Sequence, residues 1–233
     1  MIPLNLQALR RRIALACAQA GRAEDSVRLL AVSKTFDADA VRQACNAGQR
    51  AFGENYVQEG VDKVQRLRAA GCDGIEWHCI GPLQSNKTRI VAEHFDWVQS
   101  VDRLKIAQRL SEQRPEGLAP LQVCVQVNVD GGASKSGVAP HEALELARAV
   151  AALPRLRLRG LMCIPEPESD FERARAVFGR ARALFDQLRA EGLTLDTLSM
   201  GMSADLEAAV ASGSTMVRVG SALFGARDYP APG

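Results

Sequence analysis

The chain has 233 residues, of which 47% are hydrophobic and 24% charged, and its formal net charge is +2. This is the composition of an ordinary globular protein, and it excludes a disordered tail, a collagen-like repeat and a disulfide miniprotein. The near-neutral charge, and aromatic residues that are not interleaved with basic clusters, argue against nucleic acid as a partner.

Helical patterns and short apolar runs alternate along the whole chain. Residues 4–20 carry apolar side chains at helical spacing and end at Gly21, which predicts an N-terminal helix. After it we predict eight strands, at residues 29–33, 50–53, 75–80, 97–101, 121–129, 156–164, 195–200 and 215–219. Helical patterns separate them, and the most regular, over residues 170–190, follows a predicted capping box from Ser169 to Glu172.

Strict alternation of strands and helices indicates a parallel sheet, because parallel neighbours need a crossover and a helix is the usual crossover. Eight such units in 233 residues are close to the length of a typical (β/α)8 barrel, about 250 residues. We therefore predict an α/β fold, a single TIM barrel with an extra N-terminal helix. A doubly wound open sheet is the alternative, although the first strand-helix turn, at Ser33 to Thr35, lacks the glycines of dinucleotide-binding folds. No Pro/Ser-rich linker divides the chain, so we expect residues 1–233 to form one domain.

Chemistry in a barrel of this kind belongs to the C-terminal ends of the strands. Lys34 comes directly after the first predicted strand. A lysine in this position is partly desolvated, which favours the neutral amine that attacks a carbonyl group. The alternative is a lysine that extends to solvent or pairs with a carboxylate.

Two late segments combine glycine and serine at predicted helix starts. Residues 199–203 (SMGMS) lead into a helix expected to begin near Ala204, and residues 218–221 (RVGS) lead into a short helical turn. Backbone amides, glycines and hydroxyl groups in this arrangement can bind a phosphate, although each segment alone could be an ordinary turn. A phosphate there, with an amine across the barrel mouth, describes a pyridoxal phosphate pocket.

Seven short motifs, in order along nearly the whole chain, resemble those of the pyridoxal phosphate homeostasis proteins. The motifs are AVSKT (31–35), FGENY (52–56), WHCIGPLQSNK (77–87), SKSG (134–137), GLM (160–162), SMGMS-x-D (199–205) and RVG (218–220). The resemblance implies a barrel like the N-terminal domain of alanine racemases, with pyridoxal 5'-phosphate bound as a Schiff base to Lys34. It assigns seven residues to the cofactor site: Lys34, Asn55, Met202, Ser203, Arg218, Gly220 and Ser221.

The resemblance also implies a role for most of these residues. Ser203, Gly220 and Ser221 would hold the phosphate, with a backbone group of Met202, and Arg218 would face the pyridine nitrogen. A guanidinium in that place keeps the ring nitrogen unprotonated, which weakens the cofactor as an electron sink. Such an arrangement suits holding the cofactor better than strong carbanion chemistry.

The chain departs from the family at Phe36, where a second lysine or another polar residue is common. Lys135 matches the lysine of the SKSG motif. The stretch before it superficially resembles a P-loop, but Ser134 stands where a P-loop has glycine, so we do not predict nucleotide binding.

The expected function is that of a carrier, which holds the cofactor and supplies it to apoenzymes without strong catalysis. The alternative is an amino-acid racemase. Racemases of this fold take their opposite-face base, a tyrosine, from a second domain, and here the only tyrosines are Tyr56 and Tyr229. A third reading is a Schiff-base aldolase that uses Lys34 without a cofactor. We expect a monomer.

We expect a cytoplasmic protein, because no apolar stretch approaches the about 18 residues of a membrane span and six scattered cysteines lack a CxxC pair. We predict no metal site. His78 and Cys79 are adjacent, and successive strand side chains point to opposite faces, so they cannot share a metal ion. His78 is expected in the barrel interior.

Overall fold

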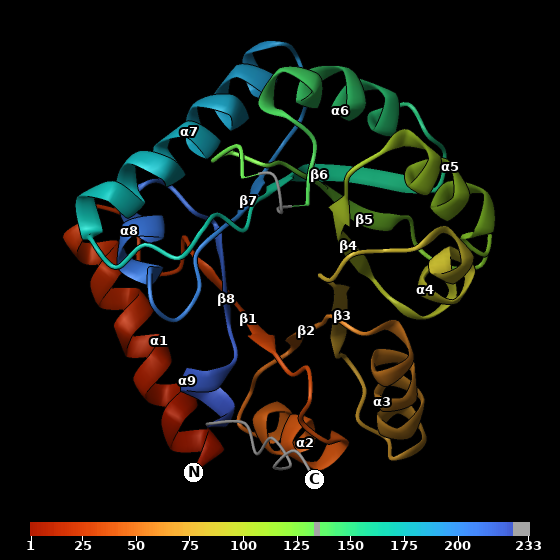
Figure 1. The fold of residues 1–233 in the computed structure, drawn as a ribbon. Helices are drawn as coiled ribbons and strands as arrows, with labels where there is room; N and C mark the ends of the chain where they lie inside the picture. Colours follow the sequence, from red (N-terminus) through yellow and green to blue (C-terminus); the bar gives the residue numbers. More distant parts are fainter. Residues whose placement is uncertain (133–135, 226–233) are drawn as a thin grey trace, which may run out of the picture.

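The structure, a computed structural model, describes residues 1–132 and 136–225 and contains a closed barrel of parallel strands (Figure 1). The strands follow one another around the barrel in chain order, and β8 pairs with β1 to close it. They are β1 Arg28–Val32, β2 Ala51–Glu54, β3 Glu76–Cys79, β4 Trp97–Val101, β5 Leu121–Gln126, β6 Leu156–Met162, β7 Thr197–Ser199 and β8 Met216–Val219. The predicted TIM barrel is confirmed.

Helices surround the barrel on its outside (Figure 1). They are α1 Ile2–Gln19, α2 Ala38–Asn46, α3 Val57–Ala69, α4 Thr88–His94, α5 Leu104–Gln113, α6 Ala143–Ala151, α7 Phe171–Ala190, α8 Leu206–Ala211 and α9 Ser221–Phe224, with 3-10 turns at Ser85–Lys87 and Pro140–Glu142. The extra N-terminal helix, α1, packs against α2, α8 and α9, beside the junction of β1 and β8. None of the helices that the structure describes has the length and apolar character needed to cross a membrane.

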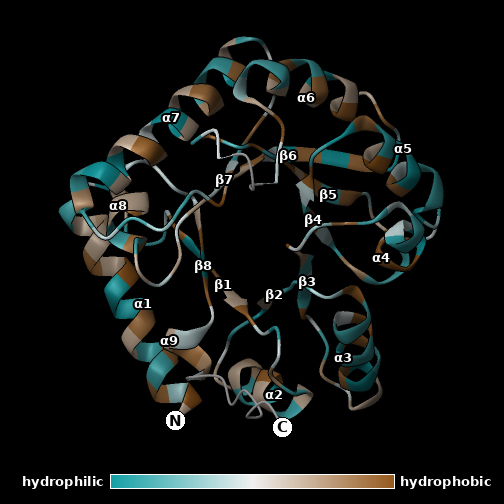
Figure 2. Ribbon diagram, in the orientation of Figure 1, coloured by the Kyte–Doolittle hydropathy of each residue, from teal (hydrophilic) through white to brown (hydrophobic). Residues whose placement is uncertain are grey.

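Side chains of the strands alternate between two buried layers. Leu29 and Ala31 of β1 belong to the large apolar core under the helices, whereas Leu30 and Val32 form a separate cluster with residues of β2, β8 and the end of β3. Burial on both faces explains why the strands read as nearly continuous apolar runs. The surrounding helices change between hydrophobic and hydrophilic stretches along their ribbons (Figure 2), as expected for helices with one buried face.

Two helix starts differ from the predictions, and the cap predicted at Ser169 is wrong. Helix α7 is capped by Asp170, whose carboxylate accepts a hydrogen bond of 2.9 Å from the amide of Arg173, and not by Ser169. Helix α8 begins at Leu206 rather than near Ala204. The carboxylate of Asp205 accepts a hydrogen bond of 2.6 Å from the amide of Met202, which holds the residues before the helix in a turn.

Candidate functional site

The predicted site residues lie on loops that follow four neighbouring strands, at the C-terminal end of the barrel. In barrel order they are Met202 and Ser203 after β7, Arg218, Gly220 and Ser221 at and after the end of β8, Lys34 after β1, and Asn55 after β2. Parallel strands place these loops at one mouth of the barrel. Residues from both ends of the sequence are therefore brought to one place.

Two of these loops come together where β1 pairs with β8. The register pairs Leu30 with Arg218 across the two strands. Beyond the paired residues, the backbones stay close: a Cβ at Gly220 would lie 3.0 Å from the carbonyl oxygen of Val32. A glycine is needed here for the close approach of the two loops, and this approach places Lys34 beside the turn of Gly220.

Lys34 is half-buried in a turn whose backbone is held firmly. The next residue, Thr35, has φ of 69°, in the left-handed region that a β-branched residue rarely adopts. Its amide donates a hydrogen bond of 2.5 Å to the carboxylate of Glu59 in α3, and the amide of Phe36 donates one of 3.1 Å to the carbonyl of Ser33. This unfavourable conformation persists because surrounding contacts hold it, which presents Lys34 in one defined place.

A buried ion cluster lies directly beneath this turn. Its centre is Lys63 of α3, whose ammonium lies 2.8 Å from the carboxylate of Glu54, 2.6 Å from that of Glu59 and 2.6 Å from the carbonyl oxygen of Ser33. The hydroxyl of Ser33 donates a further bond of 2.5 Å to Glu54. Burial raises the pKa of Glu54, and the attraction of Lys63 opposes that rise. We call these four residues the Lys63 cluster; they anchor both sides of Lys34.

Arg218 is a buried cation, with 4% of its surface exposed. Its Nη1 donates to the hydroxyl of Ser199 at 2.8 Å, and its Nη2 donates to the carbonyl of Cys163 at 2.8 Å. Within the described part of the chain, no carboxylate forms an ion pair with it. Burial lowers the pKa of Arg218 from its ordinary value, but a guanidinium stays protonated in proteins. The site therefore contains a positive charge with neutral partners.

The loops after β7 and β8 contain the residues expected to hold a phosphate. Ser203 is half-buried, and Ser221 is the exposed first residue of α9. The amide of Met202 already donates to Asp205, so this N–H is used within the loop. Hydroxyl and amide donors of Ser203, Gly220 and Ser221 are thus the better candidates for an anion.

Phe36, the departure from the family pattern, packs against the turn after β8. Its ring stacks on that of Phe224 in α9, with centroids 4.9 Å apart and an angle of 27° between the planes. This contact ties the loop of Lys34 to the turn that begins at Gly220. Phe36 therefore has a packing role in the structure.

Asn55 lies where the loop after β2 meets the loop after β3. A Cβ at Gly81 would lie 2.2 Å from the backbone oxygen of Asn55, so only glycine permits this crossing. Asn55 is half-buried, whereas the neighbouring Tyr56 is 60% exposed. Lys135 and Tyr229, the other residues singled out in the sequence, lie outside the described residues.

The structure adds residues that the sequence analysis missed. Lys63 lies on the buried face of α3 with Gly60 and Leu67, and a lysine within an apolar stripe was the available signal. Gln99 lies on β4, fully buried inside the barrel beside His78. The predicted interior position of His78 is confirmed. Among residues 1–132 and 136–225, no three His, Cys, Asp or Glu side chains gather as a metal site would require.

The chemistry of these groups fits pyridoxal phosphate. An amine that can condense with an aldehyde follows β1, a buried cation lies on the paired strand β8, and hydroxyl and amide donors suited to a phosphate occupy the loops after β7 and β8. The glycine at position 220 keeps space between them, since a side chain there would press on the backbone of β1.

Comparisons with known proteins agree with this assignment. The family model "Alanine racemase, N-terminal domain" matches residues 4–228. A pyridoxal phosphate homeostasis protein of Pseudomonas aeruginosa is 60% identical over 228 residues, which cover 98% of this chain and 96% of that protein. The structure of PipY from Synechococcus elongatus with PLP bound has a TM-score of 0.84 at 38% identity and covers 97% of this chain and 100% of that one. An alanine racemase of Clostridium difficile shares the fold, with a TM-score of 0.71 at 18% identity; the match covers 95% of this chain and 57% of the racemase.

Proposed function

The chain belongs to the family of the pyridoxal phosphate homeostasis proteins, and on this premise we propose that it binds pyridoxal 5'-phosphate as a Schiff base on Lys34 and supplies it to other proteins. The observation that carries this proposal is the pairing of β1 with β8, which brings the Lys34 loop, Arg218 and the Gly220 turn to one place. The relatives that support it are named for homeostasis of this cofactor, and a related structure, that of PipY, is described with PLP bound.

Each group at the mouth has one task in this proposal. The bound cofactor supplies an aldehyde that condenses reversibly with an amine. Lys34 provides that amine, and the Lys63 cluster keeps its backbone in place. Ser203, Gly220 and Ser221 hold the phosphate, and Asn55 lines the neighbouring part of the mouth.

Arg218 faces the pyridine nitrogen in this proposal. A guanidinium has donors only and does not release its proton at physiological pH, so it leaves that nitrogen unprotonated. The buried position and neutral partners of Arg218 support this assignment. A cofactor held in this way is a weak electron sink, which is the reason that we propose a carrier without strong catalytic activity rather than a racemase.

We also propose that residues 1–233 act as one pyridoxal phosphate-binding domain, in a monomer located in the cytoplasm. The six cysteines are free thiols, and five of them are buried. Unpaired cysteines suit a reducing compartment, where disulfides do not persist.

The proposal is tested by the visible absorbance of the purified protein, borohydride reduction and mapping of the modified lysine. We expect a yellow protein with the reduced adduct on Lys34, and no adduct in Lys34→Ala. Lys105→Ala, an exposed lysine on α5, is the matched control and should behave as the wild type. A protein that stays colourless with added cofactor, or an adduct on another lysine, would overturn the binding mode.

Two further measurements separate a carrier from an enzyme. The cofactor-loaded protein, added at one equivalent to an apoenzyme that requires pyridoxal phosphate, should restore the activity of that enzyme. The Lys34→Ala variant, treated with the cofactor in the same way, should not. Deuterium exchange at the α-carbon of a panel of amino acids should remain at the rate seen with free cofactor. Exchange that turns over many times on the protein would favour the racemase-like alternative.

A further inference from the structure

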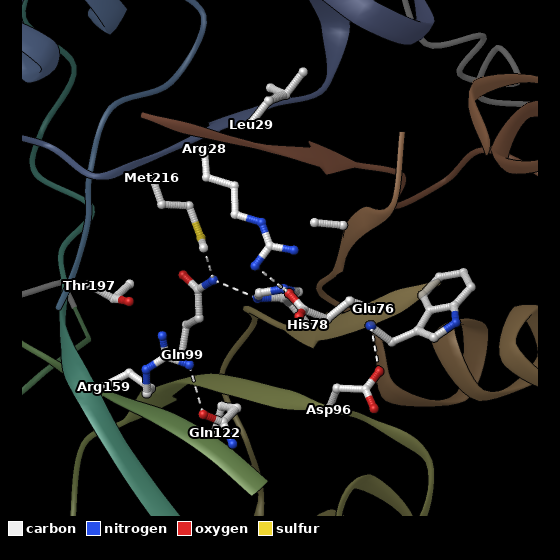
Figure 3. Close-up of polar contacts among 12 residues, drawn as sticks. Arg28, Leu29, Glu76, His78, Asp96, Gln99, Gln122, Arg159, Thr197 and Met216 are labelled. Carbon is white, nitrogen blue, oxygen red and sulfur yellow. Dashed lines mark hydrogen bonds and ion pairs between the residues drawn. The ribbon is translucent and has the colours of Figure 1, made fainter. Parts of the chain in front are cut away.

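Polar side chains run through the barrel interior from the mouth to the opposite end. Starting at Arg218 of β8, a hydrogen bond of 2.8 Å leads to Ser199 of β7, and one of 2.6 Å crosses the barrel from Ser199 to Gln99 of β4. We call the five residues Arg218, Ser199, Gln99, His78 and Glu76 the interior path. Figure 3 shows the part of the path from Gln99 to Glu76, with Gln99 between Met216 and His78 and with Arg28 beside Glu76.

The second half of the interior path reaches the N-terminal end of the barrel. The Nε2 atom of Gln99 lies 2.9 Å from Nδ1 of His78, and Nε2 of His78 lies 2.6 Å from the carboxylate of Glu76. Glu76 also pairs with Arg28 at 2.8 Å. The three middle members of the path, Ser199, Gln99 and His78, are each 0% exposed. Burying polar groups costs free energy, and such a series stabilises the protein only when every member has a hydrogen-bond partner.

The atoms that meet give the direction of each hydrogen bond in the interior path. Arg218 can only donate, so the oxygen of Ser199 accepts from it. The hydroxyl of Ser199 donates to the amide oxygen of Gln99, and the NH2 group of Gln99 faces His78. Nδ1 of His78 must accept, and its proton therefore lies on Nε2 and is donated to Glu76.

The path thus separates two charges by neutral links. The carboxylate of Glu76 stays ionised, since burial raises its pKa but the hydrogen bond from His78 and the ion pair with Arg28 hold that pKa below its ordinary value. Burial also lowers the pKa of His78, more strongly than Glu76 raises it, so the imidazole is neutral as the hydrogen bonds require. Arg218 therefore receives a fixed orientation from the path without a carboxylate at contact distance within the described residues.

Building on the proposed function, we propose that the three middle members of the interior path are positioning residues for Arg218. They hold its guanidinium in one orientation at the barrel mouth and leave its positive charge for the pyridine nitrogen of the cofactor. Gln99 is the decisive member, because its amide oxygen contacts Ser199 of β7 and its amide nitrogen contacts His78 of β3. Its NH2 group also contacts the sulfur of Met216 at 3.2 Å, which helps to hold the amide in this orientation.

The experiment compares Gln99→Leu with Gln122→Leu. Gln122 lies on the neighbouring strand β5 at the same end of the barrel (Figure 3), where it accepts a hydrogen bond of 2.8 Å from Arg159, but it is not part of the interior path. The variants therefore remove the same side chain from the same barrel, with and without the link to Arg218. Both folds are checked by circular dichroism and denaturant unfolding before the comparison.

The first readout needs no cofactor. In the cofactor-free wild type and in Gln122→Leu, nitrogen NMR should show His78 with its proton on Nε2 and resolved, slowly exchanging Nη–H signals from Arg218. In Gln99→Leu the Arg218 signals should merge through faster rotation. Unchanged Arg218 signals in Gln99→Leu, or a proton on Nδ1 of His78 in the wild type, would overturn the proposal whether or not the protein binds pyridoxal phosphate.

The second readout uses pyridoxal phosphate labelled with ¹⁵N in its ring. We expect an unprotonated ring nitrogen in the wild type and in Gln122→Leu. In Gln99→Leu we expect a displaced ring-nitrogen signal and about two- to tenfold weaker binding, the effect of one neutral hydrogen bond. If Gln99→Leu matches Gln122→Leu in both respects, the positioning role is wrong while the proposed function stands. If the wild type itself binds no cofactor, the proposed function fails and the first readout decides the positioning role alone.

Discussion

The rings of Phe36 and Phe224 stack with their centroids 4.9 Å apart, although Phe36 lies in the first strand-helix connection and Phe224 in α9, after the last strand. Because β1 and β8 are neighbours in the closed barrel, this stack lies at the junction where the chain closes on itself. It joins the loop that carries Lys34 to the turn that follows Arg218. Two halves of the candidate site are therefore tied together by an apolar contact outside the site.

Replacing Phe36 by Ala should weaken this tie. An aromatic stack and partial burial of one ring together contribute about 1 to 3 kcal/mol, so we expect a loss of that size in the free energy of unfolding in urea. The cofactor should also dissociate faster, because the two loops that hold it are no longer joined. Phe171→Ala removes a ring that is 45% exposed on α7 and serves as the control. Equal effects of the two substitutions would contradict the structural role of Phe36.

Removing one charged partner from the Lys63 cluster should destabilise the protein more than removing both. Lys63→Met leaves the carboxylate of Glu54 buried and uncompensated, with both side chains at or below 6% exposure. We expect this substitution to cost about 3 to 5 kcal/mol in the free energy of unfolding. The double variant Lys63→Met with Glu54→Gln should recover part of the loss. A double variant less stable than Lys63→Met alone would show that the pair is not coupled in this way.

Acid should destabilise the protein through His78. Burial lowers the pKa of this imidazole, and it is faced by Glu76, Arg28 and Asp96. As the pH falls below about 6.5, the ordinary value for histidine, the unfolded chain binds a proton that the folded chain does not, so stability is lost as pH falls. The expected slope is at most about 1.4 kcal/mol per pH unit.

This pH effect is measured as the difference between the wild type and His78→Gln in urea unfolding from pH 7 to pH 5. The wild type should lose more stability over this range. Glu76, whose pKa is lowered by the hydrogen bond from His78 and by Arg28, keeps its charge in the folded state over this range and contributes its own loss only at lower pH. Parallel pH profiles of the two proteins would mean that the folded state accepts the proton on His78.

The phosphate assignment is tested by Ser203→Ala. Removal of one hydroxyl donor to a charged phosphate should weaken cofactor retention by about 1.5 to 3 kcal/mol. The measurement is the cofactor remaining on the protein after dialysis, read from its absorbance. Ser212→Ala, on the turn that follows α8, is the matched control. Unchanged retention in Ser203→Ala would place the phosphate elsewhere.

Much of the fold could be read from local patterns. Each strand and helix is a short segment whose apolar spacing reflects its own burial, and for this reason all eight strands of the barrel were predicted close to their positions. The end of the first strand also identified Lys34 as a group worth examining, whereas Arg218 was assigned to the site by the family resemblance. The misplaced cap at Ser169 shows the limit of this approach, since either Ser169 or Asp170 could satisfy the helix start and only the backbone geometry selects Asp170.

The alternation of strand and helix patterns by itself determined a parallel α/β fold and favoured a barrel whose strand ends share one mouth, and the pairing of β8 with β1 in the structure closed it. Only the tertiary structure decided the contacts that complete the site: Phe36 on Phe224, Lys63 beneath Lys34, and Ser199 across the barrel from Gln99, 100 residues away in the chain. Periodicity reports whether a side chain is buried, which is a property of its own segment. A hydrogen bond or a stacked ring also requires a partner at a particular distance and direction, and those are set by the register in which the strands close.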